Sequence, residues 1–357
     1  MINTVGVYGV VFLYSMALTG LNQRIRSNDK LLINVILFTI LFLFVSLRFD
    51  VGSDYYNYTL MFDYYASESP RIRLDRWIYY TLSRIFSYYQ NGYVFVLGFY
   101  TGITYFFLIR EGSKTKLLAW YMLCFFGLDL FVDSLDRIRQ LSAMMVLLAS
   151  FELIHKRKIK SFFILIIIAS SIHISALLFT PAYWVLQIRL SNKIQIFSIV
   201  FTIVLVVTGF TSSIIGFIFE STPFYNGIYK GFISTQNQFN TGLGYASKVI
   251  FLLLATYILP KKLLILKNSI FLGSIIYIIS FGNLNIERFS NYFLLAIFPA
   301  GAYLWSTRFE SYRKCICAIM IFIYLGFFAI YNLQDRSHIG YQTIFSQNFS
   351  AQAFRKR

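Results

Sequence analysis

The stretch LLINVILFTILFLFVSL, residues 31–47, decides the class of fold because its seventeen residues carry no charged side chain. A helix that crosses a lipid bilayer needs about 20 mostly apolar residues, within a range of roughly 17 to 25. Comparable apolar runs recur along the 357-residue chain, in which 57% of residues are hydrophobic and 13% are charged. This composition excludes a water-soluble protein. It predicts an all-α, polytopic helical bundle in a membrane, because helices satisfy their own backbone hydrogen bonds in lipid.

Twelve apolar segments are candidate membrane spans, and several of them are short. They are Val5–Leu21, Leu31–Leu47, Tyr93–Ile109, Leu117–Val132, Leu141–Ile154, Ser161–Ile172, Ile174–Ile188, Ile194–Phe219, Ala246–Pro260, Ser269–Phe281, Ser290–Trp305 and Cys315–Tyr331. We expect a single transmembrane domain over residues 1–357, with about 10 to 12 membrane helices and two long outer loops, 48–92 and 220–245. The first loop contains Trp77–Tyr89, which predicts an interfacial amphipathic helix.

The distribution of lysine and arginine predicts the orientation, since loops rich in these residues stay in the cytoplasm. With the N-terminus outside, the inside loops hold 18 cations and 4 acids, and the outside holds 14 cations and 11 acids. The main ambiguity is Ser161–Ile188, which is either two short segments meeting at His173 or one long tilted helix. We favour two segments, because between Arg189 and Tyr331 they leave eight cations inside and three outside. Fusion would reverse those numbers.

Arginine is concentrated on the outer side, where it supplies 11 of the 14 cations, against 7 of the 18 inside. A guanidinium group grips phosphate with two parallel hydrogen bonds, whereas lysine is the usual cytoplasmic anchor. The outer arginines therefore indicate a phosphorylated ligand. The net charge of +17 would suggest nucleic acid in a soluble protein. Here the membrane explains it, and we expect no nucleic-acid partner.

The first outer loop opens with RFDVGSDYYNY, residues 48–58. Its acids, Asp50 and Asp54, are candidates for binding sugar hydroxyl groups, and its aromatic rings for packing on sugar carbons. The alternative is an aromatic belt at the membrane surface beside a solvated loop. The charged residues that follow are expected to be mainly interfacial. These are Asp63, Glu68, Arg71, Arg73, Asp75 and Arg76.

A second polar group marks the turn between the fourth and fifth predicted spans. It consists of Asp133, Asp136, Arg137, Arg139 and Gln140. Ionisable residues at membrane depth are usually functional or paired. A structural ion pair between Asp136 and Arg139 is therefore the alternative to a role in a site.

Two further positions lie at predicted outer ends of spans. His173, among three serines, is a candidate for acid/base chemistry or for donating to a phosphate oxygen. The alternative is a core histidine that is bonded to a backbone carbonyl. Glu287 and Arg288 repeat the pairing of acid and arginine on the outside, with a local salt bridge as the alternative.

Four segments, taken in order, resemble the EpsG-like branch of the Wzy-type polysaccharide polymerases. They are Arg48–Tyr58, Arg137–Ala143, Ser171–Leu177, and Glu287-Arg288 followed by Asn291-Tyr292-Phe293 and Pro299. The resemblance covers roughly residues 48–299, most of the chain. The family's first segment is usually followed by a Glu-Pro-Leu-like stretch before the next span. In this chain Leu74-Asp75-Arg76-Trp77 stands in that place.

The resemblance implies a membrane glycosyltransferase of the GT-C type in the bacterial cytoplasmic (inner) membrane, with an outward-facing site. Such an enzyme moves a growing glycan from undecaprenyl pyrophosphate onto a new lipid-linked repeat unit. Both lipid-linked glycans and the bilayer are then partners, and a chain-length regulator protein is a further candidate. No metal or cofactor is expected, because preorganised guanidinium groups can stabilise the charge on the leaving pyrophosphate.

The predicted site follows from this resemblance. Its pyrophosphate ligands are Arg48, Arg137, Arg139 and Arg288, its base is Asp54 or His173, and its sugar ligands are Asp50, Tyr55, Tyr58, Gln140 and Glu287. Two other functions stay open. A flippase for lipid-linked oligosaccharides would need charged residues along a central cavity, whereas this sequence clusters them at one face. A membrane acyltransferase that modifies surface glycans would favour a histidine beside an acid or another histidine deep in the bundle, and it would leave the excess of arginine unexplained.

Overall fold

The computed structural model describes residues 4–26, 29–67, 70–71, 73–211, 213, 242–281, 283–306 and 341–345. Over these residues the secondary structure is helical, apart from one isolated antiparallel bridge between Arg48 and Thr343. The predicted all-helical class is therefore confirmed. The chain divides into two compact units, a first unit of Met1–Leu177 with Gly301–Arg357 and a second unit of Leu178–Ala300. The expectation of one transmembrane domain stays a prediction.

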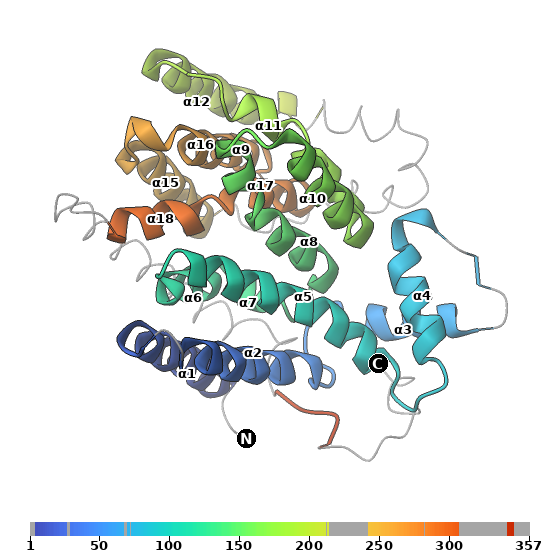
Figure 1. The fold of residues 1–357 in the computed structure, drawn as a ribbon. Helices are drawn as coiled ribbons and strands as arrows, with labels where there is room; N and C mark the ends of the chain where they lie inside the picture. The colour runs from blue at the N-terminus through green and yellow to red at the C-terminus, as the bar shows by residue number, and fades with distance from the viewer. Residues whose placement is uncertain are drawn as a thin grey trace. The chain divides into compact units, whose positions relative to one another are not determined.

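The first unit is a helical bundle around one long helix. Its elements are α1 (Thr4–Arg24), α2 (Lys30–Ser46), α3 (Tyr55–Ala66), η2 (Leu74–Arg76), α4 (Trp77–Phe86), α5 (Tyr93–Lys114), α6 (Leu118–Gly127), α7 (Leu130–Asp133), α8 (Ile138–Leu148), α9 (Ser150–His155) and α10 (Ile159–Ile172). Helix α5 packs against α2, α4, α6 and α8. Helices α1 and α2 lie side by side (Figure 1). Helix α5 is therefore the centre of this unit.

The packing of α2 on α5 follows from residues spaced four apart. Leu37, Leu41 and Val45 share one face of α2 and are fully buried. On α5, Gly98 and Gly102 share a face that the Phe42 ring covers, with ring atoms 3.4 and 3.7 Å from the respective Cβ positions. Small residues at this spacing allow two membrane helices to approach closely.

Hydropathy predicted most of these helices. Among the described residues, three stretches are long and apolar enough to cross a membrane by length and composition, namely Tyr93–Lys114, Ile138–His155 and Lys261–Ile279, and shorter apolar helices accompany them. These helices fit a multi-pass membrane protein. The predicted span Cys315–Tyr331 and most of the loop 220–245 lie outside the described residues.

Two predicted spans end or break at particular residues. The span Leu117–Val132 is divided into α6 and α7, because Asp129 has a φ of 61° that an α-helix cannot contain. Helix α10 ends at Ile172, and His173 is extended with φ −149° and ψ 118°. The predicted interruption of the chain at His173 is therefore confirmed.

The first outer loop folds into α3 and α4, which pack against each other. Helix α4 buries Tyr79 and Ser83, whereas Trp77 and Ile85 are exposed. A helix is thus present over most of the predicted Trp77–Tyr89, and it ends at Phe86. Its position in a membrane interface stays a prediction.

Polar contacts join helix ends of the first unit in two separate groups, one predicted to lie inside and one predicted to lie outside. At ends predicted to lie inside, Asn22 donates to Asn34 at 2.9 Å, and Asn34 donates to Ser113 at 3.1 Å. At ends predicted to lie outside, Arg48 donates to Leu135 at 2.9 Å. Helix α2 begins in the first group and ends at the second. This grouping agrees with the predicted order of inside and outside loops, and which end faces the cytoplasm stays a prediction.

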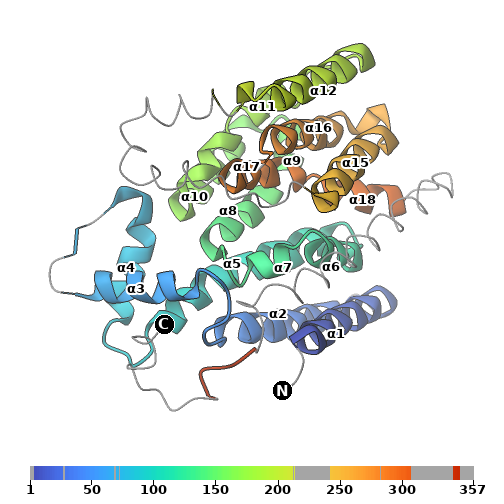
Figure 2. The same ribbon diagram turned by 180° about the vertical axis from the view of Figure 1, so that it is seen from behind.

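Helix α16 (Leu264–Ile279) is the centre of the second unit. Packed against it are α12 (Asn192–Val207), α15 (Leu243–Ile258) and α17 (Leu284–Leu294) (Figure 2). The unit also contains α11 (Ala182–Val185) and η4 (Lys261–Leu263), while η3 (Ile174–Phe179) and α18 (Ile297–Ser306) run across the limits of the two units. Gly273 lets α17 lie close to α16, since a Cβ there would be 2.6 Å from the Leu294 side chain.

Candidate functional site

The site is built on the loop that follows α2, where Arg48 is fully buried. Its Nη1 donates to Val45 O at 2.6 Å, its Nε to Val51 O at 3.1 Å and its Nη2 to Leu135 O at 2.9 Å. Its guanidinium carbon lies 5.6 Å from the ring centroid of Tyr55. Burial lowers the pKa of Arg48, because it removes water from the charged group. Arg48 therefore cross-links the loop to the turn before α8.

Gly52 determines how closely this loop approaches that turn. Its φ is +102°, and a Cβ would lie 2.4 Å from Leu135 O and 2.7 Å from Asp136 Oδ1. The next residue, Ser53, donates its backbone N–H to the same Asp136 oxygen at 2.6 Å. Only glycine combines this backbone conformation with so close an approach. The first of the four sequence segments is thus in direct contact with the turn that leads into the second.

A segment from the far end of the chain flanks Arg48. Residues 47–49 pair with residues 342–344 through two backbone hydrogen bonds of 2.8 and 3.0 Å. The Tyr341 ring stacks on Phe44 with centroids 4.1 Å apart, and its hydroxyl group donates to Phe44 O at 2.6 Å. Residues 341–345 therefore lie at the end of α2 that carries Arg48. No pattern in the sequence indicates this pairing.

Three predicted site residues lie around Tyr58, near the start of α3. Burial raises the pKa of Tyr58 and the nearby Asp54 carboxylate raises it further, whereas Arg139 and Arg48 lower it. The Tyr58 ring stacks on Tyr79 with centroids 6.1 Å apart. Asp54, Arg139 and Arg48 therefore all lie close enough to Tyr58 to influence the pKa of its hydroxyl group.

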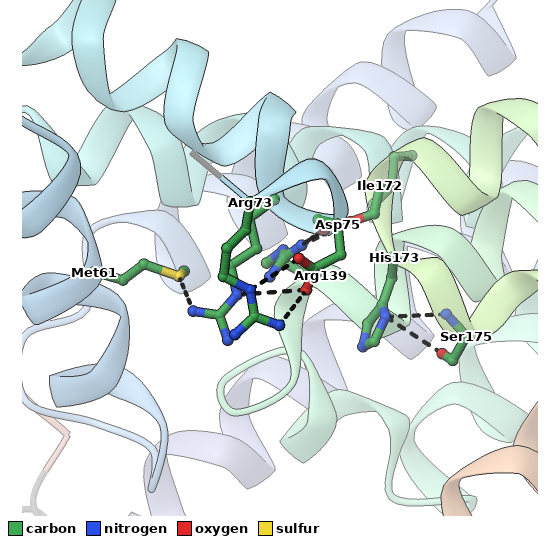
Figure 3. Close-up of polar contacts among 8 residues, drawn as sticks. Met61, Arg73, Asp75, Arg139, Ile172, His173 and Ser175 are labelled. Carbon is green, nitrogen blue, oxygen red and sulfur yellow. Dashed lines mark hydrogen bonds and ion pairs between the residues drawn. The ribbon is translucent and has the colours of Figure 1, made fainter. Parts of the chain in front are cut away.

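Arg139, in the first turn of α8, points toward η2 and the end of α10 (Figure 3). Its Nη2 donates to Asp75 O at 2.7 Å and, more distantly, to Ile172 O at 3.4 Å. Its Nε is buried and has no hydrogen-bond partner among the described residues. A buried donor left without an acceptor costs about 1–3 kcal/mol. This group is suited to a ligand oxygen or a water molecule.

Asp75 is held by two arginines of its own loop, of which Figure 3 labels Arg73. Arg73 makes a two-point contact, Nε to Oδ1 at 3.0 Å and Nη2 to Oδ2 at 3.1 Å, while Arg76 Nε lies 3.8 Å from Oδ2. Arg76 Nη1 faces Met61 Sδ at 3.3 Å, a weak acceptor. Together with Arg139, three guanidinium groups surround one aspartate. The sequence predicts only interfacial charges here, because Arg139 follows Asp75 by 64 positions.

His173 directly follows the Ile172 carbonyl that Arg139 reaches, and Figure 3 shows its ring turned toward Ser175. Its Nδ1 lies 3.4 Å from Ser175 N and 3.3 Å from Ser175 Oγ. A backbone N–H can only donate, so the contact with Ser175 N fits a ring that accepts at Nδ1 and carries its proton on Nε2. This arrangement favours His173 as a donor to a ligand oxygen over a role as the base.

Arg137 and Gln140 have other surroundings than Arg139. Arg137 forms an ion pair with Asp133, one turn earlier. Gln140 is buried. The Asp136 carboxylate accepts from the loop after α2. The turn thus contains an ion pair between Arg137 and Asp133. The alternative suggested by the sequence is instead a pair between Asp136 and Arg139. The roles of Arg137 and Gln140 in ligand binding stay predictions.

The predicted sugar ligands of the first loop differ in exposure. Tyr55 is fully buried, with its hydroxyl group 3.2 Å from that of Tyr93. Tyr58 is half-buried, and Asp50 is exposed at a φ of 51°. Asp50 and Tyr58 therefore have surface for a ligand, whereas a sugar reaches Tyr55 only when the loop moves.

Glu287 and Arg288 lie near the start of α17, within the second unit. Glu287 Oε1 accepts from Lys248 Nζ at 2.9 Å, and Lys248 Nζ lies 4.4 Å from the ring centroid of Tyr277. Tyr245 stacks on Tyr277 with centroids 5.0 Å apart. Glu287 is therefore in a salt bridge with α15, beside two tyrosine rings. Its role toward a sugar stays a prediction.

Within the described ranges, no group of three or more His, Cys, Asp or Glu side chains is placed to hold a metal ion. The first unit is thus part of an apolar helical membrane protein with arginine, tyrosine and carboxylate groups gathered at one end. The chain belongs to the EpsG family, whose family model matches residues 31–346. The resemblance of the four segments is therefore confirmed, and the protein is a multi-pass membrane protein related to polysaccharide biosynthesis. Comparison with curated proteins and with solved structures gave no match.

Proposed function

We propose that this protein is a GT-C-type glycosyltransferase that polymerises undecaprenyl-pyrophosphate-linked repeat units into a surface polysaccharide. One observation carries the proposal: three of the four family-like segments converge around Arg139. The first segment supplies Asp54 and Tyr58, the second supplies Arg139 itself, and the third begins at the end of α10 that Arg139 reaches. Polar groups that converge from distant segments are typical of a ligand site. Membership of the EpsG family supports a polysaccharide as the product.

In the proposed reaction, an acceptor hydroxyl group attacks the anomeric carbon of the donor glycan. The bond between that carbon and the pyrophosphate oxygen breaks, and its electron pair leaves with the pyrophosphate. Arg139 stabilises this developing charge, because a preorganised donor in a site of low dielectric acts without reorganisation. His173 donates through Nε2 to a phosphate oxygen. Asp54 takes the proton of the attacking hydroxyl group.

Arg48 is assigned a positioning role in place of its predicted role as a pyrophosphate ligand, because its guanidinium group is fully buried and donates to three backbone oxygens. Its three backbone contacts hold the loop that carries Asp54 against the turn that leads to Arg139. Arg137 and Arg288 remain candidate pyrophosphate ligands. The candidate sugar ligands are Asp50, Tyr55, Tyr58, Gln140 and Glu287.

The proposed location is the outer face of the bacterial cytoplasmic membrane. The arginine-rich outer loops support it, because guanidinium groups suit a pyrophosphate better than lysines do. Guanidinium groups also supply the charge stabilisation that a metal ion provides elsewhere. The reaction is therefore proposed to be independent of metal ions, which a polymerisation assay in EDTA tests.

The lipid-linked glycans of a deletion strain test the function. We expect single repeat units, attached to lipid or to their final acceptor, and no long chains. A plasmid copy of the gene should restore long chains. Accumulation of repeat units on the cytoplasmic leaflet would contradict the polymerase function and favour a flippase.

A further inference from the structure

The proposed reaction assigns no role to Arg73 and Arg76. Both lie in or beside η2, outside the four family-like segments. The turn places them around Asp75, whose backbone oxygen accepts from Arg139. Residues from two distant parts of the first unit therefore share one aspartate (Figure 3).

The contact between Arg73 and Asp75 has the geometry with which arginine binds phosphate. Two parallel N–H···O bonds of 3.0 and 3.1 Å join the guanidinium edge to both carboxylate oxygens. The side chains of Arg73 and Asp75 are 34% and 18% exposed. An anion from solvent can therefore reach the Nε and Nη2 edge of Arg73, here called the fork, and compete with the Asp75 carboxylate.

Charge and unused donors in this cluster both favour a larger anion. Three arginines surround Asp75, two at its carboxylate and one at its backbone oxygen, so three positive charges in the cluster meet one negative charge. Arg76 Nε and Arg139 Nε are buried and have no hydrogen-bond acceptor among the residues that the structure describes. A single carboxylate thus uses only part of the available donors.

We propose that Arg73, Arg76 and Arg139 form the seat of a diphosphate group, and that the Asp75 carboxylate occupies this seat while no ligand is bound. A diphosphate has two phosphoryl groups, so one can enter the Arg73 fork while the other accepts from the remaining Nε groups. It also carries more negative charge than a carboxylate. The choice of a lipid-linked diphosphate as the ligand rests on the proposed function, whereas the seat itself does not.

Binding of farnesyl diphosphate to the full-length protein in nanodiscs tests the seat. Asp75→Asn keeps the shape and removes the competing charge, so we expect at least a tenfold lower Kd. Arg73→Lys keeps the charge and loses the fork, so we expect at least a tenfold higher Kd. Arg84→Lys is the matched control and should leave Kd unchanged, because Arg84 donates to the backbone oxygens of Ala66 and Ser67.

The same assay has outcomes that overturn the proposal. A Kd that is unchanged or higher in Asp75→Asn means that the carboxylate only orients the arginines. If that variant unfolds, Arg73→Lys decides, and unchanged binding by folded Arg73→Lys overturns the seat. Equal affinity for farnesyl monophosphate overturns the diphosphate assignment. Equal affinity for inorganic pyrophosphate supports a seat that does not contact the lipid.

These results are independent of polymer formation. Loss of long chains in the deletion strain, without diphosphate binding by the purified protein, would contradict the diphosphate seat and still support the polymerase function. Diphosphate binding that is stronger in Asp75→Asn, together with normal chains in the deletion strain, would support the diphosphate seat and contradict the polymerase function.

Discussion

Arg48 and Leu135 are joined by a hydrogen bond of 2.9 Å between Nη2 and the backbone oxygen, although 87 positions separate them. Gly52 lies against the same carbonyl group. The loop after α2 and the turn before α8 therefore form one support, which carries Asp54 on one side and Arg139 on the other. Substitutions should either loosen this support or remove a ligand-binding group from it.

Arg48→Lys should loosen the support. A single ammonium group cannot reach three carbonyl oxygens that a planar guanidinium group reaches in different directions. A buried acceptor left without a donor costs about 1–3 kcal/mol. We expect the unfolding temperature of the purified protein and the polymer length to fall together. Loss of polymer at an unchanged unfolding temperature would instead identify Arg48 as a ligand-binding group.

Arg139→Lys should remove a ligand-binding group and leave the support intact. Removal of one preorganised donor costs about 10²- to 10³-fold in rate, so we expect short chains or none at an unchanged unfolding temperature. Arg84→Lys, at matched abundance in the membrane, is the control and should make chains of normal length. Normal chains from Arg139→Lys as well would contradict the assignment.

Tyr341→Ala should weaken the support from the far end of the chain. The substitution removes the stacking on Phe44 and the hydrogen bond to its backbone oxygen. An aromatic pair contributes about 0.5–1.5 kcal/mol beyond its buried area, so the unfolding temperature and chain length should both decrease. Phe345→Ala is the control, since that ring is 78% exposed. Equal behaviour of the two variants would show that residues 341–345 do not support the site.

Single cysteines test the predicted sides of the membrane. Ser53 and Ser191 are both exposed in the structure, and the native cysteines are replaced by serine. In intact spheroplasts, an impermeant thiol reagent should label Ser53→Cys and should not label Ser191→Cys until the membrane is permeabilised. Labelling of Ser191→Cys in intact cells would mean that the chain does not reverse direction at His173.

Hydropathy predicted the helices because an apolar run is a local property of the chain. Helices α2 and α5 begin within a residue of the predicted spans. The polar cluster around His173 likewise marked the end of α10. The break between α6 and α7 was not predictable, because it depends on the left-handed conformation of Asp129, which no neighbouring residue type requires.

The site was predictable in its residues and not in its contacts. Arginines at outer helix ends indicated a phosphorylated ligand, and Arg139 is indeed beside other arginines. The contact of Arg139 with Asp75 joins α8 to a turn 64 positions earlier, and residues 342–344 pair with 47–49 across nearly the whole chain. Such contacts follow from the packing of helices, which a single sequence does not specify.

Polymerisation by the purified protein tests the central claim most directly. The protein is reconstituted in liposomes with an undecaprenyl-pyrophosphate-linked repeat unit on both leaflets, and products are separated by size. We predict a ladder of chains longer than one repeat unit, with one undecaprenyl pyrophosphate released for each new glycosidic bond. Repeat units that stay single while they cross the bilayer would contradict the account.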